Sequence, residues 1–580
     1  MSTSKRIRSV FRTILLAALA FGGSGVAQAS INTDLSYVNQ QSAAYARFRN
    51  WVNQAVAGNP GYGFSANDAV VMFRLTGQAQ YCTLAASMVE AQVSAAETAI
   101  AANQNPEVAH DSYLYAGAMI GDLALTYDWC AAFVSAPQKT RWSAYAERSI
   151  ANIWTPNAAM WGSRPAPWTG WGTNDPANNY YYSFLRATMY WALAINSNTW
   201  KTYLQTQKIP PLLNYFAMLP GGGSEEGTGY GTSHHKLFEL YRVWRDSTGS
   251  DLANANPHLT DTISYWLHAS VPTRNRFAPY GDQSRSSNPE FYDYHRHLIL
   301  EARYMTASPA ARDLASWWIN NNSVQQMSSA FNYRDDLLPP GSSSTLPAAP
   351  LVYVASGIGH LFARTSWETG ATWLSFSAGS YVQSHAHQDQ GSFTLFSGDW
   401  LAVTENIWSH SGIQQGTEVH NVVRFVRNGA NVKQRAPSHS TMNITQQGPG
   451  PGEVHVTGNL SAAYPAGSGV NSWQRSLDFT GNRLLVTDQF AVVSGTQAIF
   501  QVNTPTQPTI NGNVATAGRL TVRVLEPLGA TLTAVNWRNV DSDFTSGWKL
   551  EVSGASTNTG FVVELTTGET IMKNGFDPQG

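Results

Sequence analysis

The residue types best suited to chemistry gather in one stretch, from Ser384 to Asn421. Four of the fourteen histidines fall inside it, where an even spread would place about one. The stretch opens with His385-x-His387-x-Asp389. If this segment is extended, its period of two residues turns all three side chains to the same face. Imidazoles and a carboxylate that converge on one face suit a divalent metal such as zinc, or acid–base chemistry.

The rest of the stretch has the pattern of a β-hairpin. A run from Ser392 to Phe396 is followed by a Gly398-Asp399 turn and by a second apolar run that ends near Glu405. We therefore expect a sheet to present the polar cluster, since a sheet holds ligands more rigidly than a loop does. A single histidine such as His410 is more often structural, but several costly polar side chains on one face favour a functional site.

The first 29 residues have the pattern of a secretory signal peptide. Four basic residues between Lys5 and Arg12 precede a short apolar run, and Ala27-Gln-Ala29 forms a small-residue cleavage site. We expect cleavage before Ser30 and a mature protein that is secreted or periplasmic. No later segment reaches eighteen uninterrupted apolar residues, so no membrane insertion is expected.

The net charge of the mature chain limits which kinds of molecule it is expected to bind. Removal of residues 1–29 takes away four positive charges and changes the formal net charge from −2 to −6. Nucleic-acid-binding proteins usually carry a basic face, so we expect no nucleic acid partner. The net negative charge of the protein would repel an anionic substrate. A local cluster of positive side chains would therefore have to attract it.

The only cysteines, Cys82 and Cys130, lie in two segments with helical patterns. In an oxidising compartment such a pair can form a disulfide, but buried free thiols are also common, and both alternatives stay open. Two cysteines cannot build a cysteine-rich zinc site. Any metal must therefore be held by histidine and carboxylate side chains.

Hydrophobic patterning divides the chain into a helical half and a β half. From Leu35 to about Asn321, Ala- and Leu-rich segments with helical spacing alternate with Pro, Gly and Asn breaks. Many consecutive helices are typical of an array or a closed (α/α) toroid, with a groove where the helix-end loops gather. Helices are expected near 36–57, 78–103, 110–134, 137–155, 179–196, 199–217, 224–246, 258–270, 291–306 and 308–321.

Beyond a Pro- and Ser-rich linker the apolar period changes to two, which is typical of an antiparallel β-sandwich. The fold class is therefore an α+β multidomain protein. The predicted organisation is a signal peptide at 1–29, a helical toroid domain at 30–337, a linker at 338–350 and a β-sandwich domain at 351–580.

The helical half adds two candidate patches. Residues 168–184 form an aromatic, Asn-rich segment that leads into a helix, with Asn178 or Asn179 near its N-cap. Residues 220–230 are glycine-rich and would place Glu225, Glu226 and Tyr230 on the first turns of a helix, close to a ligand. Capping and packing would explain the first patch without a function, and a flexible entry loop would explain the second.

Taken together, these features resemble the heparinase II/III-like polysaccharide lyases, which include oligoalginate lyases. The shared features are the domain order, the Asn178-Asn179 helix start, the Ser-x-Glu226-Gly…Tyr230 element and the His385-x-His-x-Asp-x-Gly-Ser-Phe stretch. They cover most of the mature chain. The resemblance implies an (α/α) toroid followed by a β-sandwich, and cleavage of uronic-acid polysaccharides by β-elimination.

The resemblance also implies catalytic roles. Tyr230 matches the catalytic tyrosine, Asn179 the residue that neutralises the substrate carboxylate, and His385 the histidine that reaches into the cleft from the sandwich. Many members have a histidine base directly after that asparagine, where this chain has Tyr180. Tyr230 must then act as both base and acid, or share the work with His385. Predicted substrate contacts are Trp171, Asn178, Tyr180 and Glu226.

A structural zinc ion is the one cofactor that the resemblance implies, and no organic cofactor is expected. Its ligands match His387, Glu405 and His420. The third ligand is usually an aspartate in the family, so Glu405 is a departure with a longer side chain. Zinc would orient the sandwich segment and support His385 without activating water.

The predicted activity is therefore that of a secreted lyase on an anionic polysaccharide or oligosaccharide. Alginate or another unsulfated polyuronate is slightly favoured over sulfated glycosaminoglycans, because no strongly basic run stands out. Endo and exo action, and any oligomeric state, fit the sequence equally well. Two other hypotheses stay open: a glycoside hydrolase that uses Glu225 or Glu226 with Asp175, and a non-catalytic glycan-binding protein.

Overall fold

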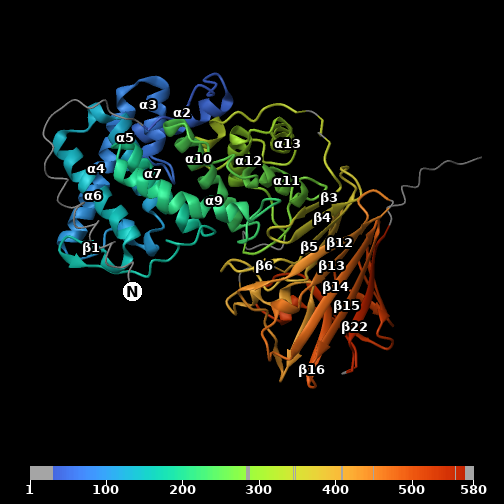
Figure 1. The fold of residues 1–580 in the computed structure, drawn as a ribbon. Coiled ribbons are helices and arrows are strands. Elements are labelled where there is room, and N and C mark those ends of the chain that lie inside the picture. Colours follow the sequence, from blue (N-terminus) through green and yellow to red (C-terminus); the bar gives the residue numbers. More distant parts are fainter. Residues whose placement is uncertain are drawn as a thin grey trace, which may run out of the picture.

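A computed structural model describes residues 31–282, 288–343, 345–346, 348–405, 409–448, 450–555 and 557–568. The predicted signal peptide and its cleavage site lie outside the described residues. The chain forms a helical part followed by antiparallel sheets (Figure 1). This arrangement confirms the predicted fold class. No helix among the described residues is long and apolar enough to cross a membrane.

The helical part consists of paired layers of helices. Neighbouring inner helices pack in the order α3, α5, α7, α10 and α12, and the outer helices α4, α6, α11 and α13 pack against them. The bounds are α2 (Ala43–Val56), α3 (Ala66–Thr76), α4 (Ala79–Ala101), α5 (Ala116–Trp129), α6 (Ala136–Trp154), α7 (Asn179–Ala194), α8 (Asn198–Tyr203), α9 (Ile209–Ala217), α10 (His234–Thr248), α11 (His258–Ala269), α12 (Asp293–Met305) and α13 (Pro309–Asn321). Helix α3 was not predicted, because its buried Asn67 and Asp68 interrupt the apolar pattern.

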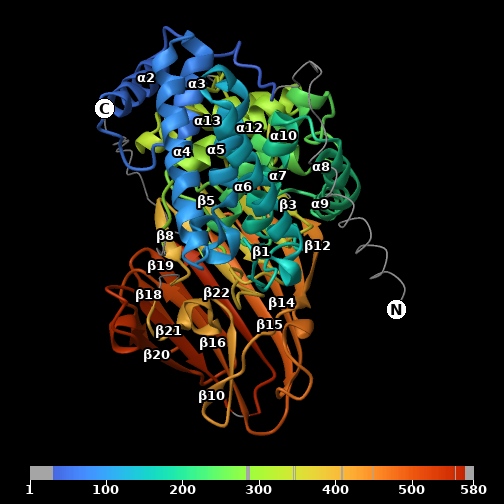
Figure 2. The same ribbon diagram turned by 90° about the vertical axis from the view of Figure 1, so that its left-hand side faces the viewer.

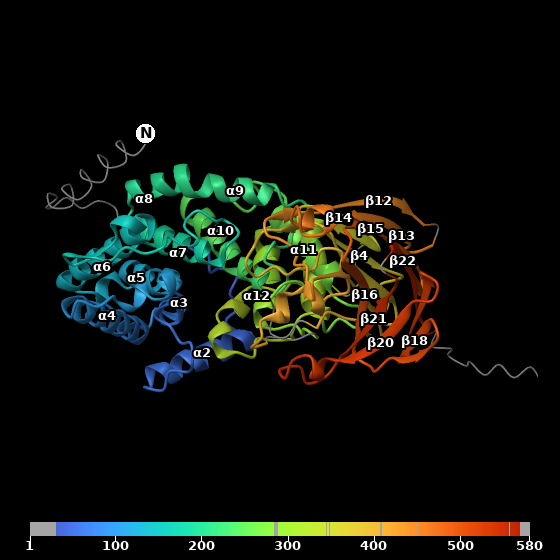
Figure 3. The same cartoon turned by 90° about the horizontal axis from the view of Figure 1, so that it is seen from below.

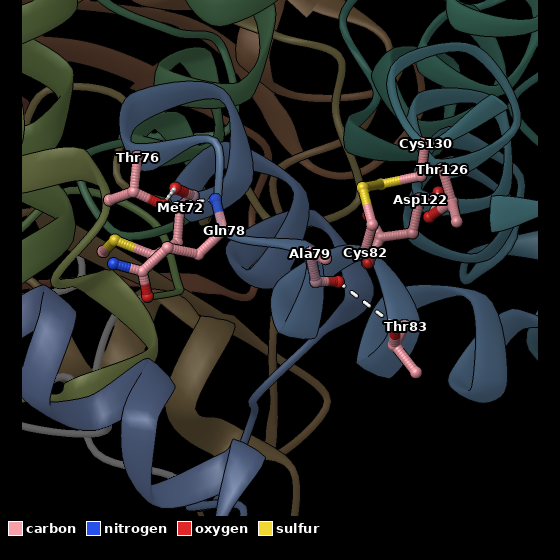
Figure 4. The surroundings of a disulfide bond; sticks show 9 residues. All are labelled: Met72, Thr76, Gln78, Ala79, Cys82, Thr83, Asp122, Thr126 and Cys130. Carbon is pink, nitrogen blue, oxygen red and sulfur yellow. Dashed lines mark hydrogen bonds between the residues drawn. A yellow bond between two sulfur atoms is a disulfide. The ribbon is translucent and has the colours of Figure 1, made fainter. Parts of the chain in front are cut away.

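A disulfide bond ties two neighbouring helices together. Cys82 of α4 and Cys130, which directly follows α5, form the bond with their Cα atoms 5.4 Å apart (Figure 4). Both residues are completely buried. The structure thereby decides between the two alternatives that the sequence left open.

The predicted helix at 224–246 begins ten residues later than expected. The chain has irregular backbone up to Gly229, a 3₁₀ turn at Tyr230–Ser233 and then α10. Gly227 has a φ of 85°, which no α-helix tolerates, and a side chain there would collide with the carbonyl oxygen of Tyr280. The prediction of helical turns was therefore wrong for Glu225 and Glu226, whereas Tyr230 begins the 3₁₀ turn that leads into α10.

The β part contains three large sheets, in which every strand pairing is antiparallel. The first sheet has the order β3 (Val352–Ala355), β4 (His360–Arg364), β5 (Thr372–Ser377), β7 (Phe393–Ser397) and β8 (Asp399–Ala402). The second has the order β12 (Thr441–Gln447), β13 (Val454–Asn459), β14 (Val470–Thr480), β15 (Arg483–Val492), β22 (Gly560–Thr567), β19 (Leu520–Glu526), β18 (Val514–Ala517) and β17 (Thr509–Asn511). The third has the order β10 (Ala430–Asn431), β9 (Val423–Arg427), β16 (Thr496–Thr504), β21 (Trp548–Ser553) and β20 (Thr531–Asn536).

The described residues also form two sheets of two short strands each. One of these sheets lies near the junction of the two parts. They are β1 (Met160–Trp161) with β2 (Arg164–Pro165), and β6 (Ser380–Tyr381) with β11 (Ser438–His439). Strand β6 lies on the side of the β part that faces the helices (Figure 1).

The first sheet joins the β part to the helices. Phe362 and Trp373 on one face belong to the helical core, whereas Leu361 and Leu374 on the other face belong to the core between the sheets. Strands β4, β5 and β7 are buried on both faces. Figure 2 shows β3, β5 and β8 of this sheet between the helices and the other sheets, and β4 contacts α11 (Figure 3). Arg364 reinforces the junction by donating hydrogen bonds to carbonyl oxygens at the end of α11. This rigid contact fixes the loops of the two parts relative to each other.

Candidate active site

The side chains of Tyr230 and His385 lie face to face where the helical and β parts meet. Their ring centroids are 3.5 Å apart and the ring planes differ by 7°. Tyr230 comes from the 3₁₀ turn before α10, and His385 comes from the loop between β6 and β7. Tyr230 is 40% exposed, so a ligand can reach it. The structure thus brings together two residues that the sequence predicted to be catalytic.

The prediction that a strand presents His385, His387 and Asp389 was wrong. Residues 382–392 form an irregular loop that turns at Gly391, where φ is 89°. The two imidazoles still converge, because both donate hydrogen bonds to a residue of the helical part. The predicted turn at Gly398, between β7 and β8, is confirmed.

The residue of the helical part that orients His385 and His387 is Asp282. Its Oδ2 accepts a hydrogen bond from Nδ1 of His385 (3.0 Å), and its Oδ1 accepts one from Nε2 of His387 (2.9 Å). Gln415 donates to Oδ2 as well. Burial by itself would raise the pKa of Asp282, but these hydrogen bonds outweigh it and hold the pKa well below its usual range. The sequence carried no signal that singled out Asp282.

Asn179 is placed for binding an anion at the N-terminus of α7. The side chain of Asn178 caps the helix by accepting a hydrogen bond from the backbone N–H of Tyr180 (3.0 Å), as predicted for one of these two asparagines. Asn179 is the first residue of the helix, and its amide oxygen is buried with no hydrogen-bond partner in the part of the chain that the structure describes. This oxygen is an acceptor and calls for a donor such as a sugar hydroxyl, whereas the amide nitrogen of the same side chain is the group that could donate to an anion. The partial positive charge of the helix N-terminus favours a carboxylate there.

Tyr180 is not suited to act as a base. Its hydroxyl donates a hydrogen bond to Oδ1 of Asp111 (2.9 Å). Burial, together with the adjacent Asp111 carboxylate, raises the pKa of Tyr180 to about 12, so the phenol is neutral near pH 7. Tyr180 also lies close enough to Tyr230 for a charge on the Tyr230 phenol to raise the pKa of Tyr180. Asp111 was missed by the sequence analysis.

The aromatic loop before α7 lies beside Tyr180. Trp171 is 48% exposed, and the adjacent Gly172 packs so closely on Tyr180 that a Cβ atom would lie 2.8 Å from that residue. The buried Lys208 donates a hydrogen bond to the carbonyl oxygen of Thr173 (2.9 Å) and holds the loop in place. An exposed indole on an anchored loop suits a sugar face.

Glu226 lies inside the protein and interacts electrostatically with His385. It is completely buried, and among the described residues neither of its carboxyl oxygens has a hydrogen-bond partner. Burial raises its pKa from 4.5 to about 7, although the nearby His385 opposes this shift. Asp175, another neighbour, raises the pKa further. The predicted contact of Glu226 with substrate remains a prediction.

Two of the three predicted zinc ligands lie together. Nδ1 of His387 and Nε2 of His420 are 3.2 Å apart, which fits two nitrogen ligands of a tetrahedral zinc ion, about 3.3 Å apart when each bond is ~2.0–2.1 Å. Burial lowers the pKa of His420, which keeps it neutral and able to bind a metal. Glu405 is buried as well, against Gly547. Among the residues that the structure describes, no group of three His, Cys, Asp or Glu side chains is placed to hold a metal ion. The histidines therefore fit zinc, whereas Glu405 does not complete the set.

Comparisons with known proteins show what this arrangement is similar to. No protein-family model matches the sequence, and no curated protein matches it. Among solved structures, heparinase III aligns with a TM-score of 0.58 at 12% identity, over 93% of this chain and 80% of that chain. The chain has the fold of heparinase III.

Two further structures have the same architecture. Heparan sulfate lyase HepC from Pedobacter heparinus aligns with a TM-score of 0.56 at 14% identity, over 93% of this chain and 86% of that one. Chondroitin AC lyase from Streptomyces coelicolor A3, solved in complex with chondroitin sulphate, aligns with a TM-score of 0.50 at 11% identity, over 98% and 83%. At these identities the likeness is one of fold. It agrees with the predicted order of a helical toroid followed by a β-sandwich.

Proposed function

We propose that this protein is a polysaccharide lyase that cleaves a uronic-acid-containing polysaccharide by β-elimination. The observation that carries the proposal is the stacked pair of Tyr230 and His385, 3.5 Å apart, at the junction of the two parts. The place of Asn179 at the N-terminus of α7, where a substrate carboxylate would be favoured, supports it. The solved structures with the same fold include lyases that act on heparan sulfate and chondroitin, which agrees with this class of reaction.

The proposed reaction begins with neutralisation of the uronate carboxylate. Asn179 and His385 donate hydrogen bonds to it, and this stabilises the enolate-like intermediate that forms when the adjacent C–H bond breaks. Asp282 keeps His385 in the orientation needed, since it accepts a hydrogen bond from Nδ1. With a proton on both ring nitrogens, His385 can then donate from Nε2 to the substrate carboxylate. Preorganised donors of this kind usually supply the largest share of the rate enhancement.

Tyr230 then transfers the proton. Its phenolate oxygen takes the proton from the carbon next to the carboxylate, and the electrons of the C–H bond form a carbon–carbon double bond as the bond to the glycosidic oxygen breaks. The same phenol returns the proton to the leaving oxygen. A phenol with an ordinary pKa near ~10 needs a nearby positive charge or donor to act as a base. The stacked imidazole of His385 is the group placed to provide one. Tyr180 is excluded from this role by its hydrogen bond to Asp111.

Zinc bound by His387 and His420 forms part of this proposal as a structural element. Such an ion would hold the loop that carries His385 against the β part. Asp282 and Thr404 lie at the outward-facing nitrogens of these two rings, in the position of supporting groups that orient metal-binding histidines. No step of the reaction depends on the metal.

The remaining elements of the proposal concern location and substrate. The signal-peptide pattern supports export to the periplasm or beyond. The absence of a strongly basic run in the sequence favours alginate or another unsulfated polyuronate.

The test is to follow the near-ultraviolet absorbance of an unsaturated uronate product. Purified wild type and Tyr230→Phe are incubated with a panel of alginate, glucuronan and glycosaminoglycan chains and their oligomers. Absorbance that rises with wild type and not with the variant is expected. Saturated reducing ends without absorbance would instead identify a hydrolase, and binding without turnover would identify a glycan-binding protein.

A further inference from the structure

A strained backbone segment reaches the candidate active site at Asp111. Three consecutive residues have left-handed backbone angles: Asp111 (φ 44°), Ser112 (φ 52°) and Tyr113 (φ 66°). Asp adopts this conformation more readily than most residues, but a bulky aromatic residue such as Tyr113 rarely does. Strain of this kind persists only where the surroundings enforce it, and it gathers at functional sites.

The surroundings of the segment do enforce it. Tyr113 is buried and packs on Trp168, with ring centroids 4.9 Å apart. On the other side, Ser183 of α7 donates a hydrogen bond to the carbonyl oxygen of Leu114 (2.6 Å). With Tyr113 and Leu114 held, the carboxylate of Asp111 is directed toward α7. It is therefore a fixed group and not a mobile surface side chain.

The carboxylate of Asp111 lies beside the first turn of α7, which carries Asn179. Its Oδ1 accepts the hydrogen bond from the hydroxyl of Tyr180, the residue next to Asn179. Asp111 itself is exposed, and Tyr115, one turn further along the chain, is 49% exposed beside Tyr180. Across the described parts of the chain, no second side chain donates a hydrogen bond to this carboxylate. Since a carboxylate has about four acceptor positions, most of them are left for a ligand.

We propose that Asp111 determines the specificity of this site for unsulfated sugars. This inference rests on the proposed lyase function. The free oxygen of Asp111 accepts a hydrogen bond from a hydroxyl group of the sugar next to the scissile bond. A sulfate ester on that hydroxyl would remove the donor and set two negative charges within a few ångströms of each other. Repulsion of this kind near a protein surface corresponds to a discrimination on the order of 10-fold or more.

Asn in place of Asp111 tests the inference, because it keeps the size and the acceptor for Tyr180 but removes the charge. The substrates are one unsulfated polyuronate oligomer and the same oligomer sulfated on its hydroxyl groups. Wild type should have a kcat/KM at least about 10-fold higher on the unsulfated oligomer. In Asp111→Asn this ratio should fall by a similar factor, mainly through better use of the sulfated oligomer.

Asp313→Asn is the matched control, because it removes an equal charge from the exposed face of α13. Its ratio should equal that of wild type. An unchanged ratio in Asp111→Asn would overturn the inference. If no unsaturated product forms with wild type, the proposed function fails, and the dissociation constants of both oligomers are measured calorimetrically instead. A selectivity in binding that disappears in Asp111→Asn would then still support the role of Asp111, whereas equal or no binding of both oligomers would overturn it.

Discussion

Replacing the buried Glu226 by Gln should make the stability of the protein less dependent on pH. The carboxyl group is completely buried, has no hydrogen-bond partner within the described ranges, and has its pKa raised by burial from 4.5 to about 7. The folded state thus holds this proton more tightly than the unfolded state does. Wild type should lose stability as the pH rises from about 4.5 to 7, because the folded protein must then ionise a carboxyl group in an apolar environment.

The size of the effect follows from the pKa difference. Each pKa unit corresponds to about 1.4 kcal/mol, so the shift amounts to about 3 kcal/mol. Glu226→Gln keeps the shape of the side chain and cannot ionise. Its free energy of unfolding should be close to that of wild type near pH 4.5 and about 3 kcal/mol higher near pH 8.

Urea unfolding at several pH values, followed by tryptophan fluorescence with the disulfide intact, measures this difference. Glu368→Gln serves as the control, because Glu368 is exposed and its replacement should leave the pH dependence of wild type unchanged. The reasoning is refuted if wild type and Glu226→Gln lose stability in parallel between pH 4.5 and 8. A Glu226→Gln protein that is less stable at every pH would mean that the carboxyl group has partners in solution.

Four further predictions concern the disulfide, the site and the metal. Cys82→Ser combined with Cys130→Ser should lower the free energy of unfolding by about 4 kcal/mol, measured with urea, because the bond closes a loop between residues 48 positions apart. Tyr180→Phe should keep its activity on unsulfated substrate within about 10-fold of wild type, whereas Tyr230→Phe should lose roughly 10²–10⁴-fold in kcat. Asp282→Asn should lower kcat about 10- to 100-fold, as measured by product absorbance, since it no longer orients His385. If zinc is bound, elemental analysis should find it in wild type, and His420→Ala should contain less and melt at a lower temperature.

Each of these predictions has a contrary outcome. Equal stability of the double cysteine variant would show that the cross-link does not restrict the unfolded chain. Loss of activity in Tyr180→Phe as large as in Tyr230→Phe would assign proton transfer to both tyrosines. Full activity in Asp282→Asn would remove the orienting role of that carboxylate. An unchanged melting temperature of metal-free protein would exclude structural zinc.

Much of the fold was readable from the sequence, because helices and strands depend on local spacing. The apolar period of 3.6 residues located almost every helix, and Asn178 marked the start of α7. The apolar pattern did not locate a helix where polar residues are buried as well, or where glycines with positive φ interrupt the backbone. Helix α3 buries Asn67 and Asp68 and so lost its apolar pattern, and the glycines before Tyr230 adopt angles that delay α10.

The sequence by itself identified the candidate functional residues: Tyr230, Asn179 and the histidines around His385. Only the tertiary structure decided how they work together. Asp282 and His385 lie on different parts of the fold, and nothing in the residues around Asp282 indicates that it accepts hydrogen bonds from two histidines. Hydrogen bonds and burial depend on distances between segments that are remote in the chain, whereas sequence patterns report only neighbours within a few residues. For that reason the hydrogen-bond partners of the predicted catalytic groups could be found only in the fold.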